Sequence, residues 1–187
     1  MSVTLLLGGA RSGKSSFAVR YAERCGGRVV YLATAPPIDD DMEQRIARHR
    51  EERPADWETI EEPIDLIGAF ERVADETDIL IIDCLTLWTS SMMWHGRSDD
   101  SIIEGAEEAA NRCRSRAGRV IAISNEVGLG VHPDTALGRR YRDVLGSVNQ
   151  RWAAATDDAL LMVAGRALRL HSPADLLDLH GAGGHLP

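Results

Sequence analysis

The stretch that decides the fold is Gly8-Gly9-Ala10-Arg11-Ser12-Gly13-Lys14-Ser15. It fits the pattern G-x-x-x-x-G-K-S/T at every required position, and it stands between an apolar run, residues 3–7, and a segment with helical periodicity, residues 14–24. Glycines let backbone N–H groups turn inward around phosphate oxygens, and the helix dipole favours an anion there. In this pattern Lys14 reaches the β- and γ-phosphates and the Ser15 hydroxyl binds Mg²⁺. The stretch therefore predicts a P-loop that cradles a nucleoside triphosphate.

Outward from the P-loop, short apolar runs alternate with helical patterns. We expect buried strands at residues 3–7, 29–33, 79–82, 120–124, 159–164 and 168–170, and a short strand at residues 57–60. We expect helices at residues 14–24, 39–52, 63–74, 85–94, 101–116 and 133–155. Such alternation is typical of an α/β fold with a mostly parallel sheet and helices on both faces. The sequence predicts a P-loop NTPase fold in one domain, residues 1–171, followed by a peripheral tail, residues 172–187.

The composition argues against polymeric and membrane partners. The 187 residues carry a formal net charge of −8, and only 5% of them are aromatic. An acidic chain repels nucleic acid and anionic membranes, and scarce aromatics disfavour a stacking platform for single strands. No apolar run approaches the roughly 20 residues that cross a bilayer. Three cysteines, Cys25, Cys84 and Cys113, have no metal-ligand spacing, as is typical of reduced thiols. We expect a cytoplasmic protein with no nucleic-acid partner and no membrane span.

Arginines gather in two places along the chain. They are Arg45, Arg48, Arg50 and Arg53 in the first cluster, and Arg139, Arg140 and Arg142 in the second. Each cluster is consistent with a basic pocket for a small anionic substrate and equally with a solvated helix face. The residues alone leave both interpretations open.

Two further side chains are candidates for chemistry, Asp83 and His49. Asp83 follows the apolar run 79–82, and in a P-loop fold the carboxyl end of such a strand lies beside the phosphate cradle. Its carboxylate could hold the metal or cap the next helix, and the two roles are compatible. His49 lies between Arg48 and Arg50. A neutral imidazole can attack phosphorus, and guanidinium groups would stabilise the developing charge, although spacing alone favours a structural or solvated histidine.

A switch GTPase is disfavoured by two departures from its pattern. Such proteins usually have glycine three positions after the aspartate that corresponds to Asp83, and here that position is Thr86. They also carry Asn-Lys-x-Asp to read guanine, whereas the most similar string here is Ser124-Asn125-Glu126-Val127. A signalling module that works through guanine-dependent switching therefore fits poorly.

Strings beyond the P-loop carry a family resemblance. They are Tyr31-Leu32-Ala33-Thr34-Ala35, Asp39-Asp40-Asp41-Met42, Arg45-Ile46 with His49, Arg53-Pro54 with Trp57, Asp83-Cys84-Leu85-Thr86-Leu87-Trp88, Ser124-Asn125-Glu126-Val127-Gly128-Leu129-Gly130, Arg140-Tyr141-Arg142-Asp143, Val148-Asn149-Gln150 and Val163-Ala164-Gly165. Together with the P-loop, they resemble the bifunctional adenosylcobinamide kinase/adenosylcobinamide-phosphate guanylyltransferase family of cobalamin biosynthesis. The resemblance runs from residue 3 to about residue 170.

The resemblance implies a two-step enzyme. A nucleoside triphosphate, ATP or GTP, phosphorylates the aminopropanol hydroxyl of adenosylcobinamide. GTP then guanylylates a histidine of the protein with release of pyrophosphate, and the GMP passes to adenosylcobinamide phosphate to give adenosylcobinamide-GDP. The family position of this histidine falls on His49, with Lys14 as the second catalytic residue.

Other site residues follow from the same resemblance. Residues 8–15 hold the triphosphate, while Ser15 and Asp83 bind Mg²⁺. The nucleotide-binding positions outside the P-loop are Ala33, Thr34, Ala35, Arg50, Glu51, Glu52, Arg53, Glu61 and Asp83. The family assembles as a trimer, so a homo-oligomer is expected. Trp88, Met92, Met93 and Trp94 are candidates for that interface and equally for burial under a neighbouring helix.

Four positions depart from the family pattern or keep two interpretations. Asp41 stands where glutamate is common, and Ser90-Ser91 stand where asparagine is expected, and none of these touches the P-loop or His49. Glu126, which follows a strand, is either a metal or substrate contact or general base, or a loop residue that caps backbone N–H groups.

Three functions compete. The first is the bifunctional kinase and guanylyltransferase, and the second is a simple P-loop kinase for a small metabolite in which His49 is only structural. Covalent labelling of the protein by GTP would separate these two. The third is a non-catalytic nucleotide-binding module, which would bind without turnover.

Overall fold

The computed structural model describes residues 2–36, 40–51, 53–74, 77–175 and 177. Within them a seven-stranded sheet has the order β3-β2-β4-β5-β1-β6-β7. The strands are β1 (Ser2–Gly8), β2 (Val29–Ala33), β3 (Glu58–Glu61), β4 (Ile79–Asp83), β5 (Arg119–Ile123), β6 (Asp158–Val163) and β7 (Arg166–Leu170). Neighbouring strands pair in parallel, except that β7 pairs antiparallel with β6. The predicted fold class, a mostly parallel sheet in a P-loop NTPase fold, is confirmed.

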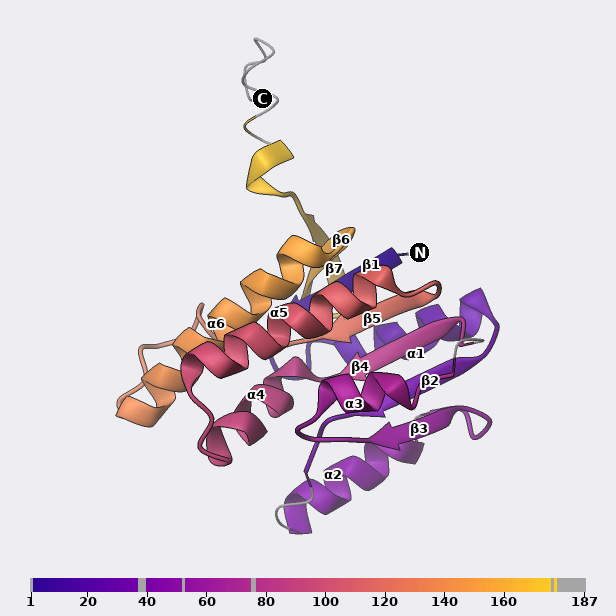
Figure 1. Ribbon diagram of the computed structural model, residues 1–187, viewed down its shortest axis with the longest axis horizontal. Helices are drawn as coiled ribbons and strands as arrows, with labels where there is room; N and C mark the ends of the chain where they lie inside the picture. The colour runs from indigo at the N-terminus through magenta and orange to yellow at the C-terminus, as the bar shows by residue number, and fades with distance from the viewer. Residues whose placement is uncertain (1, 37–39, 52, 75–76, 176, 178–187) are drawn as a thin grey trace.

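Helices cover both faces of this sheet (Figure 1). They are α1 (Lys14–Cys25), α2 (Asp40–Glu51), α3 (Leu66–Glu71), α4 (Leu85–Trp94), α5 (Asp99–Ser115) and α6 (Ala136–Ala155). The helices α3, α4, α5 and α6 lie on one face, α1 lies on the other, and α2 lies beside β3 at the end of the sheet. Among the described helices, none combines the length and the apolar character that crossing a membrane would require.

The two faces of the sheet bury two separate cores because successive strand residues point to opposite sides. In β1, Leu5 packs into the larger core with Trp88 and Trp152 on the four-helix face. The adjacent Leu6 packs into the smaller core with Ala18 of α1. A strand covered on both sides reads as a continuous apolar run, which is why β1 was visible in the sequence.

Two predicted helices begin later than their prolines suggested. The helix expected from residue 63 begins at Leu66, where the Asp65 side chain accepts a hydrogen bond from Gly68 N. The helix expected from residue 133 begins at Ala136, where the Thr135 side chain caps the first turn. Proline is favoured in the first turn of a helix, but in both places a polar N-cap residue further along the chain sets the start.

Of the aromatic and methionine side chains considered for an interface, two are buried. Trp88 is 2% exposed and Met93 is 9% exposed, so burial under neighbouring helices is the correct interpretation for both. Trp94 is 87% exposed. Residues 173–175 and 177, beyond β7, are helical and exposed, while the rest of the proposed tail from residue 178 lies outside the described residues. The division at residue 171 and the trimer both stay predictions.

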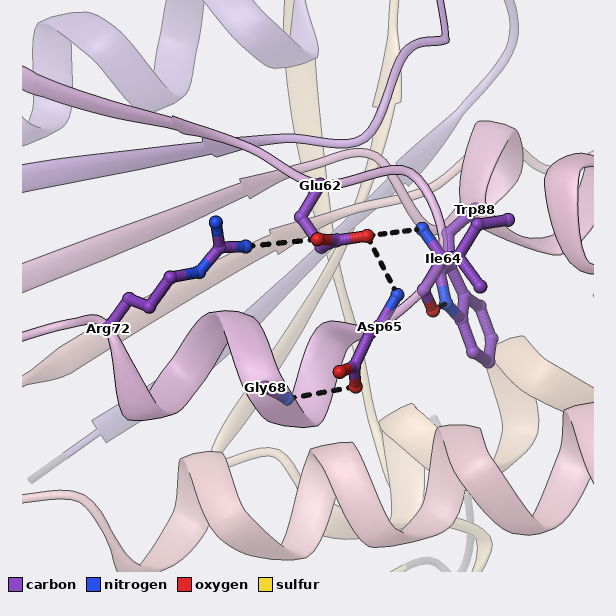
Figure 2. A network of polar contacts seen from close by, with 6 residues as sticks. All are labelled: Glu62, Ile64, Asp65, Gly68, Arg72 and Trp88. Carbon is purple, nitrogen blue, oxygen red and sulfur yellow. Dashed lines mark hydrogen bonds and ion pairs between the residues drawn. The ribbon is translucent and has the colours of Figure 1, made fainter.

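Glu62, immediately after β3, organises the loop that leads into α3 (Figure 2). Its Oε1 accepts hydrogen bonds from Ile64 N at 3.1 Å and from Asp65 N at 3.0 Å. Its Oε2 accepts a bond from Arg72 Nη2 at 3.1 Å. Trp88 Nε1 in turn donates to Ile64 O at 2.8 Å, so this loop also anchors α4.

We expect Glu62→Ala to lower the free energy of unfolding by about 1–2 kcal/mol, because the backbone N–H groups of Ile64, which is half-buried, and Asp65, which is exposed, lose a charged acceptor. The matched variant Arg72→Ala removes only the ion pair, whose arginine is 50% exposed, and should cost less than about 1 kcal/mol. Urea denaturation of both variants measures the difference. Equal losses for the two variants would show that the ion pair, rather than the backbone caps, stabilises the loop.

Candidate functional site

The P-loop joins β1 to α1 and places Lys14 at its centre. Gly8 and Gly13 have φ angles of 148° and 95°, which disfavour any residue with a Cβ, and a Cβ on Gly8 would clash with the Met162 carbonyl oxygen. Lys14 is only 7% exposed, and its Nζ donates to Gly8 O and Gly9 O, both at 2.8 Å. The ammonium group is therefore held against the loop backbone, where the pattern requires a cation.

A tight turn between β6 and β7 supports the P-loop from the side. Ala164 and Gly165 form this two-residue turn with φ angles of 51° and 74°. Gly165 N donates to Ser12 O at 3.0 Å, and a Cβ on Gly13 would lie 3.4 Å from Gly165 Cα. Sequence reasoning missed this contact. The only trace of this turn in the sequence was the string at residues 163–165, to which no role was assigned.

A cleft of about 240 Å³ lies where the carboxyl ends of the central strands meet the P-loop. The predicted site residues that line it are Ala10, Arg11, Ser12, Gly13, Lys14, Ser15, Ala33, Ala35, His49, Arg53, Glu61 and Asp83. Sequence reasoning assigned no site role to several other lining residues, which are Ser16, Ile46, Cys84, Thr86, Leu87, Ile123 and Asn125. The cleft thus brings the phosphate cradle and His49 together from segments far apart in the sequence.

The remaining predicted site residues that the structure describes do not line the cleft. Thr34 is fully buried, and its hydroxyl accepts from Cys84 N at 2.7 Å and donates to Cys84 O at 2.6 Å. Arg50, near the end of α2, forms an ion pair with Glu61 of β3. Glu51 is the last residue of α2 and is exposed. Gly8 and Gly9 contribute carbonyl oxygens to Lys14, and Glu52 lies outside the described residues.

Arg53, Tyr31 and Asp83 contact one another in series at the cleft. The Arg53 guanidinium lies over the Tyr31 ring, with its Cζ 3.7 Å from the ring centroid. The Tyr31 hydroxyl donates to Asp83 Oδ2. Burial, reinforced by the charge of Asp83, raises the pKa of Tyr31 well above its ordinary value, so its hydroxyl keeps the proton that it donates. Sequence reasoning assigned Arg53 and Asp83 but gave Tyr31 no role.

Asp83 does not cap the helix that follows it. The N-cap of α4 is Cys84, with no side-chain cap bond, and the Asp83 carboxylate bonds to Tyr31 instead. Of the two roles considered for Asp83, capping is therefore absent from the structure. The metal role stays a prediction.

The donors along the cleft fit magnesium that arrives with a nucleotide. The Ser15 hydroxyl and the Asp83 carboxylate line the same cleft and are hard oxygen ligands of the kind Mg²⁺ prefers. Among the described residues, no group of three or more His, Cys, Asp or Glu side chains is placed to hold a metal ion. Mg²⁺ sites commonly use one or two protein ligands together with substrate phosphates, which is the arrangement these two residues would complete.

The loop after β5 is tied to the P-loop and to α4. Asn125 N donates to Thr86 Oγ1 at 2.7 Å, and Glu126 N donates to Gly8 O at 3.2 Å. The Glu126 side chain accepts from Gly128 N at 2.5 Å, so it acts here as a backbone cap. Its alternative role as a metal or substrate contact or general base stays a prediction.

The second arginine cluster has structural partners near the start of α6. Arg139 donates to Pro133 O at 3.0 Å, and Arg140 forms an ion pair with Asp99 at 2.7 Å. Arg142 pairs with Asp143 at 2.8 Å. Neither these residues nor their partners line the cleft. The interpretation as a structural helix face applies to this cluster, while Arg53 of the first cluster reaches the cleft.

A second hollow in the protein is poorly suited to phosphate. It measures about 910 Å³ and lies between α3 and α5. Four glutamates line it, at positions 71, 104, 107 and 108, together with Arg112 and Arg116. Such a rim repels anions. The smaller cleft at the P-loop is therefore the candidate active site.

Cys84 lines the candidate active-site cleft, but its thiol should react slowly. Burial, with a further contribution from Asp83, raises the pKa of Cys84 to about 12. Burial likewise raises the pKa of Cys113 to about 12, while Cys25 is exposed. A thiol reacts as its thiolate, so the thiols of Cys84 and Cys113 should both be inert at neutral pH.

We expect a disulfide reagent at pH 8 to modify one thiol rapidly in the native protein and three after denaturation in guanidinium chloride. The Cys25→Ser variant should lose the rapid phase, while Cys84→Ser should keep it unchanged. The absorbance of the released aromatic thiolate counts the groups. A rapid phase of two thiols that falls to one in Cys84→Ser would contradict the raised pKa of Cys84.

Comparison of the sequence with known proteins identifies the family of the chain. Residues 4–170 match the sequence model of the family described as cobinamide kinase / cobinamide phosphate guanyltransferase. The bifunctional adenosylcobalamin biosynthesis protein CobP of Pseudomonas aeruginosa is 42% identical over 167 residues, covering 89% of this chain and 95% of that protein. Proteins named bifunctional adenosylcobalamin biosynthesis protein CobU are 33% identical in Escherichia coli and 34% identical in Salmonella typhimurium, each covering 89% of this chain and 98% of the relative. The chain is a transferase and belongs to the cobinamide kinase / cobinamide phosphate guanyltransferase family.

Proposed function

We propose that the protein phosphorylates adenosylcobinamide with a nucleoside triphosphate and then transfers GMP from GTP to adenosylcobinamide phosphate through a covalent GMP intermediate on His49. The product is adenosylcobinamide-GDP. The observation that carries this proposal is that His49 lines the same cleft as Lys14 and Ser15 of the P-loop. The membership of the chain in the family supports the substrate class.

The guanylyl transfer takes place in two displacements. A ring nitrogen of His49 attacks the α-phosphorus of GTP, the bond from that phosphorus to the bridging oxygen breaks, and pyrophosphate leaves with the electron pair. A phosphate oxygen of adenosylcobinamide phosphate then attacks the same phosphorus. The phosphorus–nitrogen bond breaks, and the imidazole is regenerated. Splitting one transfer into two steps is the usual advantage of a covalent carrier.

The cradle stabilises charge in both activities. Lys14 and the P-loop N–H groups face the developing negative charge on the phosphate oxygens, at the positive end of α1. Arg53, which also lines the cleft, is a second cation for the same purpose. Mg²⁺ held by Ser15 and Asp83 would neutralise charge on the triphosphate. In the kinase step the aminopropanol hydroxyl attacks the γ-phosphorus instead. The bond from that phosphorus to the β,γ-bridging oxygen breaks, the nucleoside diphosphate leaves with the electron pair, and the hydroxyl proton passes to water.

A simple P-loop kinase with a structural His49 is the second candidate. It would use the same Lys14, Ser15 and Asp83, so those residues do not separate the two functions. The position of His49 in the lining of the cleft that holds Lys14 and Ser15 favours the covalent route, because a carrier histidine must lie within reach of the bound triphosphate. The non-catalytic module is disfavoured because the family is one of transferases.

A single-turnover chase tests the proposal. The protein is incubated with GTP and Mg²⁺, freed of nucleotide by gel filtration, and mixed with adenosylcobinamide phosphate. We expect up to one equivalent of adenosylcobinamide-GDP per loaded site, with no free GTP present. Product that appears only when GTP is added back would mean direct transfer from GTP and would overturn the histidine carrier.

A further inference from the structure

We propose that Tyr31 is a positioning residue of this active site. Its hydroxyl orients the carboxylate of Asp83 on the metal side, and its ring orients the guanidinium of Arg53 on the nucleotide side. The inference rests on the proposed function, because it assigns those two roles to Asp83 and Arg53. Tyr31 does not line the cleft, so it acts through these neighbours rather than on the substrate.

The hydroxyl fixes the orientation of Asp83. It donates to Oδ2 only, and a carboxylate has two acceptor oxygens, so Oδ1 is the oxygen that we assign to the metal. A carboxylate held at one oxygen cannot rotate freely, which lowers the entropic cost of presenting the other oxygen. Partners of this kind behind a metal ligand typically change metal affinity or activity by about 10–100-fold when they are removed.

The ring supports Arg53 through its flat face. The guanidinium lies 3.7 Å from the ring centroid, a distance typical of a cation–π contact. Stacking uses the face of the guanidinium and leaves its N–H edge for other partners. The Nε of Arg53 is buried and has no hydrogen-bond partner within the described part of the chain. A phosphate oxygen or a guanine carbonyl is an acceptor that this edge could take.

Both supports come from a side chain that has little freedom to move. Tyr31 is 1% exposed and belongs to β2, which is flanked by β3 and β4 in the sheet. Its partners lie on different elements, since Asp83 ends β4 and Arg53 follows α2. One rigid ring therefore sets the relative position of two groups that reach the cleft separately.

Tyr31→Phe isolates the hydroxyl, because the ring remains under Arg53. We expect this variant to bind a non-hydrolysable GTP analogue about tenfold more weakly than wild type in Mg²⁺, and equally well in EDTA, by titration calorimetry. The thermal unfolding midpoint serves as the control for folding. Equal weakening with and without Mg²⁺, or tighter binding in Mg²⁺, would overturn the role of the hydroxyl.

Two double variants distinguish positioning from general support of the core. In the Asp83→Ala background, Tyr31→Phe should cause no further loss of analogue affinity. Tyr31→Leu should weaken binding in EDTA as well, by about five- to thirtyfold, and this loss should vanish in the Arg53→Met background. Additive losses in both backgrounds would contradict the proposal. The analogue is bound without turnover, so these affinities do not depend on guanylylation of His49. Failure of the Tyr31 proposal is therefore distinct from failure of the proposed function.

Discussion

Replacing His49 with asparagine is expected to abolish guanylyl transfer while cobinamide phosphorylation stays within a few fold of wild type. Asparagine keeps a polar side chain of similar reach on the cleft wall, but its amide nitrogen is not a nucleophile. Removal of the nucleophile of a covalent mechanism should reduce the rate of guanylyl transfer by at least about 10³-fold. The kinase step uses the substrate hydroxyl as nucleophile and does not need the imidazole.

The two activities are measured separately, with labelled ATP for phosphorylation and with labelled GTP and preformed adenosylcobinamide phosphate for guanylyl transfer. His132→Asn is the matched control, because His132 is exposed, contacts Arg142 and does not line the cleft. It should leave both rates unchanged. Retained guanylyl transfer in His49→Asn would exclude His49 as the carrier, and parallel loss of both activities would assign His49 a structural or binding role.

Lys14→Met is expected to lower both activities, each by at least about 10²-fold. The variant keeps a side chain of similar length but removes the cation that faces the triphosphate in either transfer. It also removes the donors to Gly8 O and Gly9 O, so the unfolding midpoint must be compared with that of wild type.

The matched control is Arg24→Met, which removes a cation from the exposed last turn of the same helix, α1. It should leave both activities unchanged. A Lys14→Met variant that is folded and loses guanylyl transfer but keeps phosphorylation would show that the two reactions use different phosphate cradles. That result would contradict a single cleft for both.

The parts of the fold that could be predicted from the sequence are those with local causes. The P-loop combines a fixed glycine pattern with a strand before it and a helix after it, and all three features lie within about 25 consecutive residues. The central strands are covered on both faces and therefore stand out as apolar runs. The errors at the starts of α3 and α6 arose because Pro63 and Pro133 were taken as first-turn residues, while Asp65 and Thr135 provide the caps.

The rest of the site depends on contacts between distant segments. Tyr31 and Asp83 are 52 positions apart, and they meet because β2 and β4 are neighbours in the sheet. The bond between Gly165 and Ser12 likewise requires that β6 pair with β1. Spacing alone favoured a structural His49, and the resemblance gave it a chemical role. The structure adds the independent fact that this histidine lines the cleft of Lys14.

The most direct test of the covalent carrier is intact-protein mass spectrometry after incubation with GTP and Mg²⁺, for wild type and His49→Asn side by side. We predict a mass increase of one GMP in wild type, lost on brief acid treatment as a phosphoramidate should be, and no increase in the variant. A wild-type protein that binds GTP but gains no mass, or a variant that gains the same mass as wild type, would contradict the covalent carrier.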